Sequence, residues 1–180
     1  MRLRSALLLA LVASGGCASV PATAERREVI TKILPSTVQL RSEREGGGRR
    51  AASGVVLASD PDSGRSWILT TRHFLEPATS QRIYVRAPGR PGRVEATVSR
   101  LGSDVDLALI VVEGIVLPPV TLKEVVRLGD EVWVLAFPWG RRLTVASGVV
   151  SQISSEESEA PVEGPARMID ASVSYGGSGG

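Results

Sequence analysis

Short segments rich in Val and Ile, separated by turn residues, constrain the fold of this chain most strongly. Gly and Pro cluster in the pieces between them, such as residues 45–48, 60–64 and 87–92, and no helical period of adequate length interrupts the pattern. Closely spaced strands without crossover helices indicate an all-β barrel or sandwich. We predict strands at residues 37–42, 52–58, 66–71, 82–86, 94–101, 107–112, 131–137, 143–151 and 167–173.

Composition supports a globular protein and excludes some partners. The 180 residues are 43% hydrophobic and 22% charged, which is enough to build a core and argues against wholesale disorder. The formal net charge is only +2, so we expect no nucleic-acid partner.

The N-terminus has the features of a secretory signal. Arg2 and Arg4 precede a short apolar run at residues 6–13, which is too short to remain as a membrane span. Cys17 follows small residues, as at the lipidation site of a bacterial lipoprotein signal. The alternative is ordinary cleavage after residues 22–24. We expect residues 1–17 to be a lipoprotein signal, with a lipid anchor at Cys17 and an exported protein of the bacterial cell envelope, facing the periplasm or otherwise secreted.

Cys17 is the only cysteine, so we expect no internal disulfide and a fold held by its core. Residues 18–35 are predicted to form a linker with a short helix near residues 27–34 that ends at Pro35. The acidic segment 156–159 is interpreted as a solvated loop without a function.

Two titratable residues stand at the ends of predicted strands. His73 is the only histidine and follows the apolar segment 67–71. Alone it would be interpreted as a structural or exposed histidine. Asp106 opens the apolar segment 107–112, either as a loop carboxylate that caps a turn or as a buried carboxylate that orients an imidazole through its ring N–H.

Ser178 lies among four glycines near the C-terminus. Flanking glycines let the backbone approach a substrate and present N–H groups to a developing oxyanion. A flexible linker is one alternative, which the strand-like residues before it disfavour. The nucleophile elbow of an α/β-hydrolase is another, which fails because no histidine follows the serine.

The chain resembles the HtrA (Deg) branch of the chymotrypsin-fold serine peptidases, both in the order His73, Asp106, Ser178 and in the short sequence motifs around these residues. The similarity is carried by the segments 53–56, 67–75, 104–110, 128–140, 144–151 and 169–180. Each segment is weak evidence by itself, but six in the same order are specific.

The resemblance implies a serine endopeptidase that acts on polypeptides, with no cofactor and no metal. Ser178 would be the nucleophile, His73 the general base and Asp106 its partner. The N–H groups of Gly176 and Ser178 would form the oxyanion hole, and Ser172 would lie at the floor of a neutral specificity pocket. It further implies two β-barrels, at residues 36–113 and from residue 125, joined by residues 114–124.

Two departures from the family pattern modify these expectations. Gly177 stands where the HtrA family usually has Asn. The sequence ends at residue 180, soon after Ser178, so we expect residues 125–180 to form an incomplete second barrel without a PDZ domain. The alternative function is therefore a catalytically inactive binding module, or a truncated fragment, with the same fold. The natural substrate and the oligomeric state are not indicated.

Overall fold

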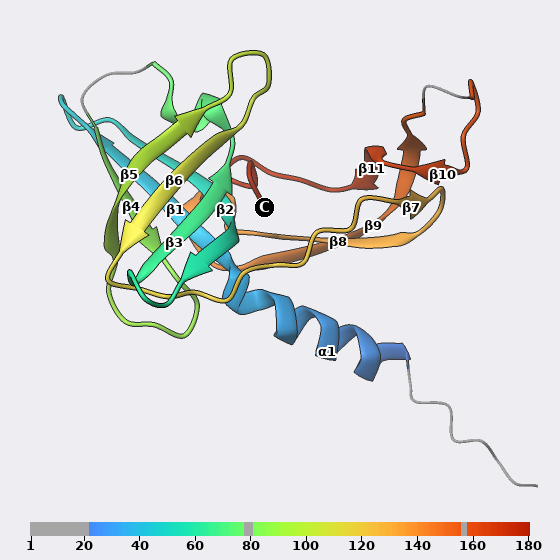
Figure 1. Ribbon diagram of the computed structural model, residues 1–180, viewed down its shortest axis with the longest axis horizontal. Helices are drawn as coiled ribbons and strands as arrows, with labels where there is room; N and C mark the ends of the chain where they lie inside the picture. The colour runs from blue at the N-terminus through green and yellow to red at the C-terminus, as the bar shows by residue number, and fades with distance from the viewer. Residues whose placement is uncertain (1–21, 78–80, 156–157) are drawn as a thin grey trace, which may run out of the picture.

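A closed barrel and two open sheets follow an N-terminal helix (Figure 1) in the computed structural model, which describes residues 22–77, 81–155 and 158–180. Six antiparallel strands close the barrel in the order β1-β2-β3-β6-β5-β4. Their bounds are β1 Thr37–Arg44, β2 Arg49–Asp60, β3 Arg65–Thr70, β4 Gln81–Arg86, β5 Val94–Leu101 and β6 Ala108–Glu113.

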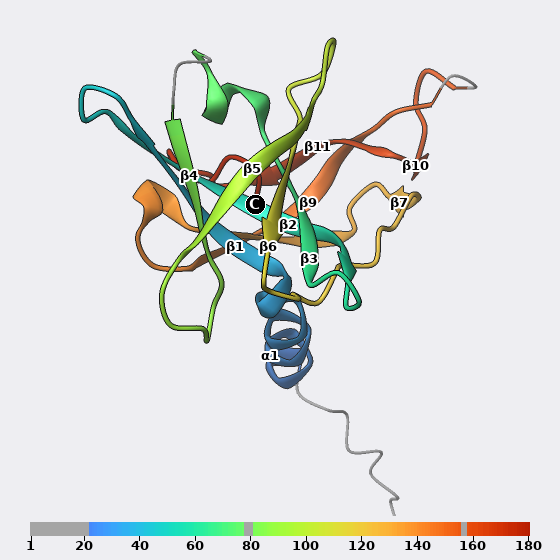
Figure 2. The same cartoon turned by 60° about the vertical axis from the view of Figure 1, so that its left-hand side comes forward.

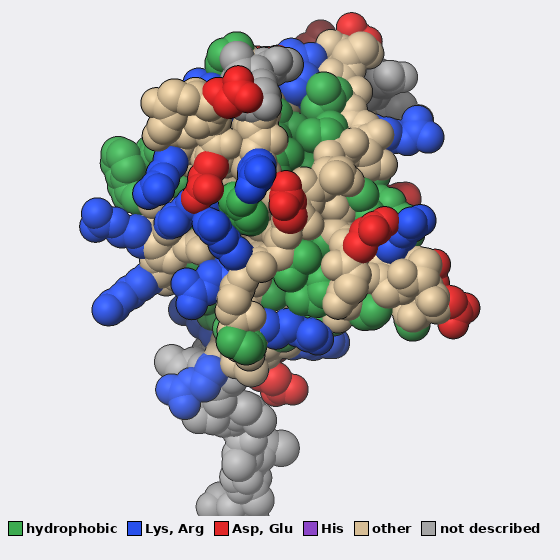
Figure 3. Space-filling view, turned by 90° about the vertical axis from the view of Figure 1, so that its left-hand side faces the viewer, with side chains coloured by type: hydrophobic (Ala, Val, Ile, Leu, Met, Phe, Trp, Pro, Cys, Tyr) green, Lys and Arg blue, Asp and Glu red, His purple; other side chains and the backbone are tan. Residues whose placement is uncertain are grey.

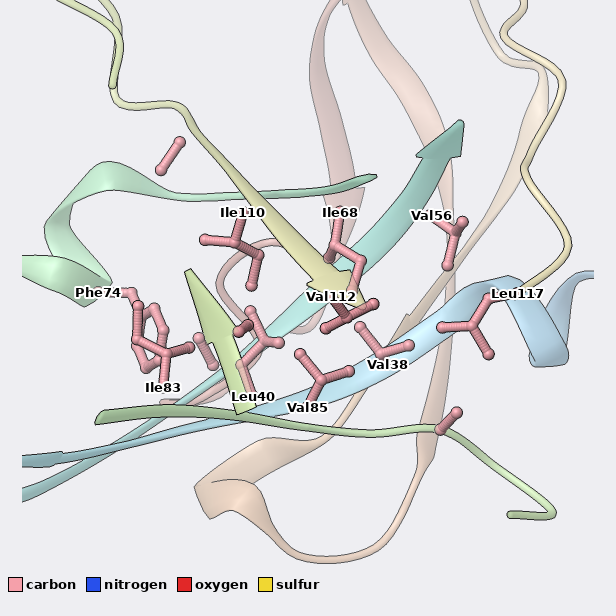
Figure 4. Packing of buried hydrophobic residues seen from close by; sticks show 14 of the residues in the cluster. Val38, Leu40, Val56, Ile68, Phe74, Ile83, Val85, Ile110, Val112 and Leu117 are labelled. Carbon is pink, nitrogen blue, oxygen red and sulfur yellow. The ribbon is translucent and has the colours of Figure 1, made fainter. Parts of the chain in front are cut away.

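The interior of this barrel is the main core of the molecule. Burial alternates along its strands, as in β6, where Ala108, Ile110 and Val112 point inward. Figure 4 shows Ile110 and Val112 packed against Leu40 and Ile68 from other strands. The period-two pattern in the sequence therefore produces a filled barrel rather than a ligand cavity.

The second half of the chain forms two smaller sheets. Strands β8 (Glu131–Ala136), β9 (Thr144–Ile153) and β11 (Ala166–Ala171) make a three-stranded sheet in the order β11-β9-β8. Strands β7 (Val126–Arg127) and β10 (Glu163–Gly164) pair with each other. The three-stranded sheet is open, and apolar side chains on it, such as Val149 and Ile169, remain exposed. These features confirm the predicted all-β fold, in which one barrel is closed and the remaining sheets are open.

The predicted strands are present, with ends that shift by a few residues. The two-residue strands β7 and β10 were not predicted, because their pairing comes from tertiary contact rather than from a sequence pattern. The helix α1 (Ala22–Ile33) begins earlier than the predicted helix at residues 27–34. Residues 22–24 are good or adequate helix formers, and Pro35 limits the C-terminal end as expected.

Three single-turn 3₁₀ helices complete the described structure: η1 (Leu34–Ser36), η2 (Arg72–Leu75) and η3 (Pro138–Gly140). Figure 2 shows η3 beside β1. Among the described residues, no helix is long and apolar enough to span a membrane. The predicted signal and Cys17 lie outside the described residues.

Candidate active site

His73 is presented by the short helix η2, directly after the barrel strand β3. Thr71 is extended and follows the last residue of the strand, and the chain then turns into η2. The backbone N–H of His73 donates a 2.8 Å hydrogen bond to Oδ1 of Asp106. The position of the ring is thus tied to a residue far along the sequence.

Asp106 lies in the connection between β5 and β6. The N–H of Leu107 donates to the carbonyl of Val105 and the N–H of Gly102 donates to the carbonyl of Leu107, which keep this connection tight. Nη1 of Arg72 donates to the carbonyls of Gly102 and Ser103, at 2.9 Å each. Arg72 therefore clamps the Asp106 loop to the helix that carries the histidine.

Ser178 lies in a turn that crosses from the open sheet to the barrel. Gly176 and Gly179 both have φ of +84°, in the left-handed region that favours glycine. A Cβ at Gly179 would stand 2.3 Å from the carbonyl oxygen of Ser53, and one at Gly176 would stand 2.6 Å from the nitrogen of Trp139. Only glycine permits this approach at either position, which explains why the serine is flanked by this residue type.

These three elements bring the predicted residues together. Nδ1 of His73 lies 2.6 Å from Oδ2 of Asp106, and Nε2 lies 3.2 Å from Oγ of Ser178. The imidazole therefore bridges the carboxylate and the hydroxyl. A serine hydroxyl that contacts one imidazole nitrogen while a carboxylate contacts the other is the arrangement for serine nucleophilic catalysis.

The carboxylate of Asp106 is half exposed, so of the two alternatives for this residue the buried carboxylate is not the one that the structure shows. The side chains of His73 and Asp106 are 52% and 53% exposed. The reason is that Asp106 sits in a rim loop outside the barrel wall, and no described segment covers it. Its partner is nevertheless the imidazole that the sequence predicted.

Hydrogen bonding lowers the pKa of Asp106, first through the side chain of His73 and then through its backbone N–H. The carboxylate is therefore ionised at neutral pH and can only accept hydrogen bonds. It selects the tautomer of His73 that carries its proton on Nδ1, which leaves the Nε2 lone pair facing Ser178.

Ser53, in β2, is a residue of this site that the sequence did not single out. It is fully buried, and its N–H donates a 2.8 Å hydrogen bond to the carbonyl of Ser178. Its Oγ donates to the carbonyl of Gly176 and accepts from the N–H of Phe137, both at 2.9 Å. Ser53 thus fixes the carbonyls of Gly176 and Ser178 toward strand β2 of the barrel. The segment 53–56 that resembles the family contains Ser53, but nothing in the sequence indicates that its hydroxyl contacts the turn of Ser178.

The predicted oxyanion donors are Gly176 and Ser178. Within the described part of the chain, neither backbone N–H donates to a protein acceptor, whereas the N–H of Gly177 donates to the carbonyl of Ser174 at 2.8 Å. The described residues thus leave both amides without a protein acceptor, which an oxyanion hole requires.

A small hollow of about 30 Å³ adjoins the turn. Ser172 lines it, together with Gly177 and apolar residues of β8, and none of the lining residues is charged. Its lining offers no opposite charge to a charged side chain. Over residues 22–77, 81–155 and 158–180, no cluster of His, Cys, Asp and Glu suited to a metal ion is found.

The chain is similar in sequence to known trypsin-like peptidases. The sequence profile described as "Trypsin-like peptidase domain" matches residues 52–180. The chain is 31% identical over 154 residues to the putative protease Do-like 3, mitochondrial, of Arabidopsis thaliana, covering 81% of this chain and 25% of that protein. It is 30% identical over 159 residues to the probable periplasmic serine endoprotease DegP-like of Pseudomonas fluorescens, covering 86% of this chain and 31% of that protein. The chain thus spans about a quarter to a third of the length of these relatives.

Solved structures resemble the same region. The crystal structure of Deg5 matches with a TM-score of 0.68 and 25% identity, over 89% of this chain and 79% of that chain. The serine endoprotease from Yersinia pestis matches with a TM-score of 0.69 and 23% identity, over 89% of this chain and 53% of that chain. This likeness confirms the predicted chymotrypsin-like fold.

Proposed function

We propose that this chain, which belongs to the trypsin-like peptidase domains of the HtrA (Deg) family, is a serine endopeptidase that hydrolyses peptide bonds through His73, Asp106 and Ser178. The observation that carries the proposal is the imidazole of His73, which lies within hydrogen-bond distance of both other side chains. The three residues are separated widely in sequence, so their convergence is a property of the fold.

The chemistry follows from the orientation of the imidazole between Asp106 and Ser178. In our proposal, Nε2 of His73 takes the proton of the Ser178 hydroxyl as Oγ attacks the carbonyl carbon of the substrate. The imidazolium that forms is stabilised by the ionised Asp106 on the other side of the ring. His73 then protonates the leaving amine, and water releases the acyl group by the same steps in reverse.

The negative charge of the tetrahedral intermediate needs preorganised donors. We propose that the unpaired N–H groups of Gly176 and Ser178 supply them. Because Ser53 binds the carbonyls of both residues, the turn that carries the two N–H donors does not have to reorganise during the reaction. We also propose that the hollow lined by Ser172 binds the side chain before the scissile bond, with a preference for small or medium apolar groups.

The alternative is a binding module of the same fold that does not catalyse. One observation favours it: His73 and Asp106 are both about half exposed, and hydrogen bonds that share the site with water are weaker than those in a dry site. Substrate binding would have to cover the pair for catalysis to be efficient.

Hydrolysis of casein by the purified chain tests the proposal. Replacing Ser178→Ala should lower turnover by about 10⁶-fold, as the loss of the nucleophile does in related triads. The control is Ser99→Ala, which removes an exposed hydroxyl from β5 and should leave turnover unchanged. Equal hydrolysis by the Ser178→Ala variant and the parent would remove this serine from the mechanism.

We further propose that the protein is exported to the bacterial cell envelope and anchored by lipid at Cys17. Support comes from the N-terminal sequence and from the periplasmic location named for the DegP-like relatives. Incorporation of labelled palmitate into the parent, and its loss in Cys17→Ser, tests the anchor. Incorporation that persists in Cys17→Ser would contradict it.

A further inference from the structure

Two neighbouring hollows on the barrel wall form one groove that is lined by arginines. Gln39, Arg41 and Arg86 line both hollows. Arg93 adds to one of them, and Arg141 and Arg142 add to the other. We propose that this arginine groove binds an acidic stretch of the polypeptide substrate, an inference that rests on the function proposed above.

The groove has an excess of positive charge that the protein itself does not neutralise. Arg93 lies 2.9 Å from Glu43 and over the ring of Tyr84. In contrast, the side chains of Arg86, Arg141 and Arg142 pair with no carboxylate of the described residues. No Asp or Glu lines either hollow. In Figure 3, which faces this side of the barrel, Lys and Arg side chains gather on the left half of the surface.

Hydrogen bonds between β1 and the η3 turn fix the backbone around the arginines. Nε2 of Gln39 donates a 2.7 Å hydrogen bond to the carbonyl of Arg141, and Nη2 of Arg41 donates to the carbonyl of Gly140 at 3.3 Å. These bonds hold the η3 turn against β1, as the two elements lie in Figure 2. The charges are therefore presented by strands and an anchored turn rather than by a free loop.

The groove continues into the candidate active site. Pro138 and Thr144 line both the groove and the hollow that contains Ser172. An extended peptide advances about 3.3 Å per residue, so a substrate seated in that hollow reaches the arginines within a few residues. This continuity favours a substrate segment over a membrane surface as the occupant.

Carboxylates fit this lining better than other side chains. Guanidinium groups bind carboxylates with two parallel hydrogen bonds, and each arginine without an acidic partner is free to do so. Because the groups are exposed, the attraction should weaken as salt is raised. The groove would then select substrates with Asp or Glu to one side of the cleaved bond.

A binding assay on the Ser178→Ala chain tests the groove without the complication of hydrolysis. The probes are two fluorescent peptides with the same apolar centre, one flanked by Glu and the other by Gln at the same positions. We expect fluorescence anisotropy to give a lower dissociation constant for the Glu peptide than for the Gln peptide. The groove variant Arg86→Gln, Arg141→Gln and Arg142→Gln should weaken that binding about tenfold, since exposed ion pairs contribute modestly each.

The control carries the same change in net charge on other surfaces: Arg27→Gln, Arg100→Gln and Arg167→Gln. It should bind the Glu peptide as the parent does. Equal binding of both peptides, or an equal loss in the control, would overturn the inference. Binding of phosphatidylglycerol vesicles in place of the Glu peptide, lost only in the groove variant, would also overturn it and assign the groove to a membrane.

Hydrolysis of the Gln peptide by the chain with Ser178 intact separates this inference from the proposed function. If the Gln peptide is cleaved but the Glu peptide has no advantage, only the groove inference fails. If the Glu peptide binds through the groove but neither peptide is cleaved, the proposed function fails and the groove remains a peptide-binding surface.

Discussion

Ser53 offers the sharpest test of how the barrel positions the nucleophile turn. Replacing Ser53→Ala removes one hydroxyl and leaves the carbonyl of Gly176 and the N–H of Phe137 without a partner. A buried polar group that loses its partner costs about 1–3 kcal/mol, so two such groups predict a loss of about 2–6 kcal/mol in the free energy of unfolding. The turn that carries Ser178 should also lose its fixed geometry.

The kinetic effect should exceed what a loss of stability produces. A displacement of the reacting groups by about 1 Å can cost about 10²-fold in rate, so we expect kcat to fall by about that factor with a smaller change in KM. Urea denaturation gives the stability, and steady-state hydrolysis under conditions where both variants are folded gives kcat and KM.

Ser66 provides a matched control within the same barrel. It is also fully buried. Its Oγ accepts from the N–H of Leu117 and from the hydroxyl of Ser59 and donates to the carbonyl of Ile115, all at 2.9 Å. The variant Ser66→Ala should lose a similar free energy of unfolding but keep its kcat, because these contacts lie away from Ser178. If both variants lose kcat equally, or if Ser53→Ala loses stability alone, Ser53 does not position the turn.

Other predictions follow from the same contacts. Asp106→Asn should lower kcat by about 10⁴-fold, since an amide at this position no longer selects the productive tautomer of His73. Because hydrogen bonding lowers the pKa of Asp106, its contribution to stability is present above the ordinary carboxyl pKa and is lost as pH falls through the lowered value. The difference in urea midpoint between parent and Asp106→Asn should therefore shrink only as pH falls below the ordinary Asp pKa of 3.8, and a difference that persists undiminished well below that pH would contradict the assignment. Gly176→Ala should reduce hydrolysis strongly, because its Cβ would meet the nitrogen of Trp139, and unchanged kcat would show that the turn tolerates a side chain. Ile68→Ala should lower the free energy of unfolding by about 2–5 kcal/mol through a cavity in the barrel, and a loss below 1 kcal/mol would mean that the core collapses around the gap.

The sequence predicted those parts of the protein that depend on local pattern. Alternating apolar residues give the barrel strands, and the glycines around Ser178 anticipate a turn that only glycine can form. His73 was identifiable because it is the only histidine of the chain and stands at a strand end.

The remaining features depend on contacts between distant segments. Ser53 and Arg72 are ordinary residues in a strand and a short helix. The role of Ser53 arises only when the second half of the chain packs against the barrel, and that of Arg72 only when the connection between β5 and β6 folds against η2. The exposure of Asp106 could not be predicted either, because it depends on which loops cover the barrel rim. The arginine groove likewise combines residues from β1, β4 and the η3 turn that no linear pattern connects.

Labelling with a fluorescent fluorophosphonate measures most directly whether the imidazole activates the serine hydroxyl. The reagent forms a covalent bond with a serine Oγ only when that oxygen is made nucleophilic. We expect modification of Ser178 in the parent, with mass spectrometry locating the adduct, and its loss in His73→Ala. Absence of labelling in the folded parent, or labelling that persists without the imidazole, would contradict the account.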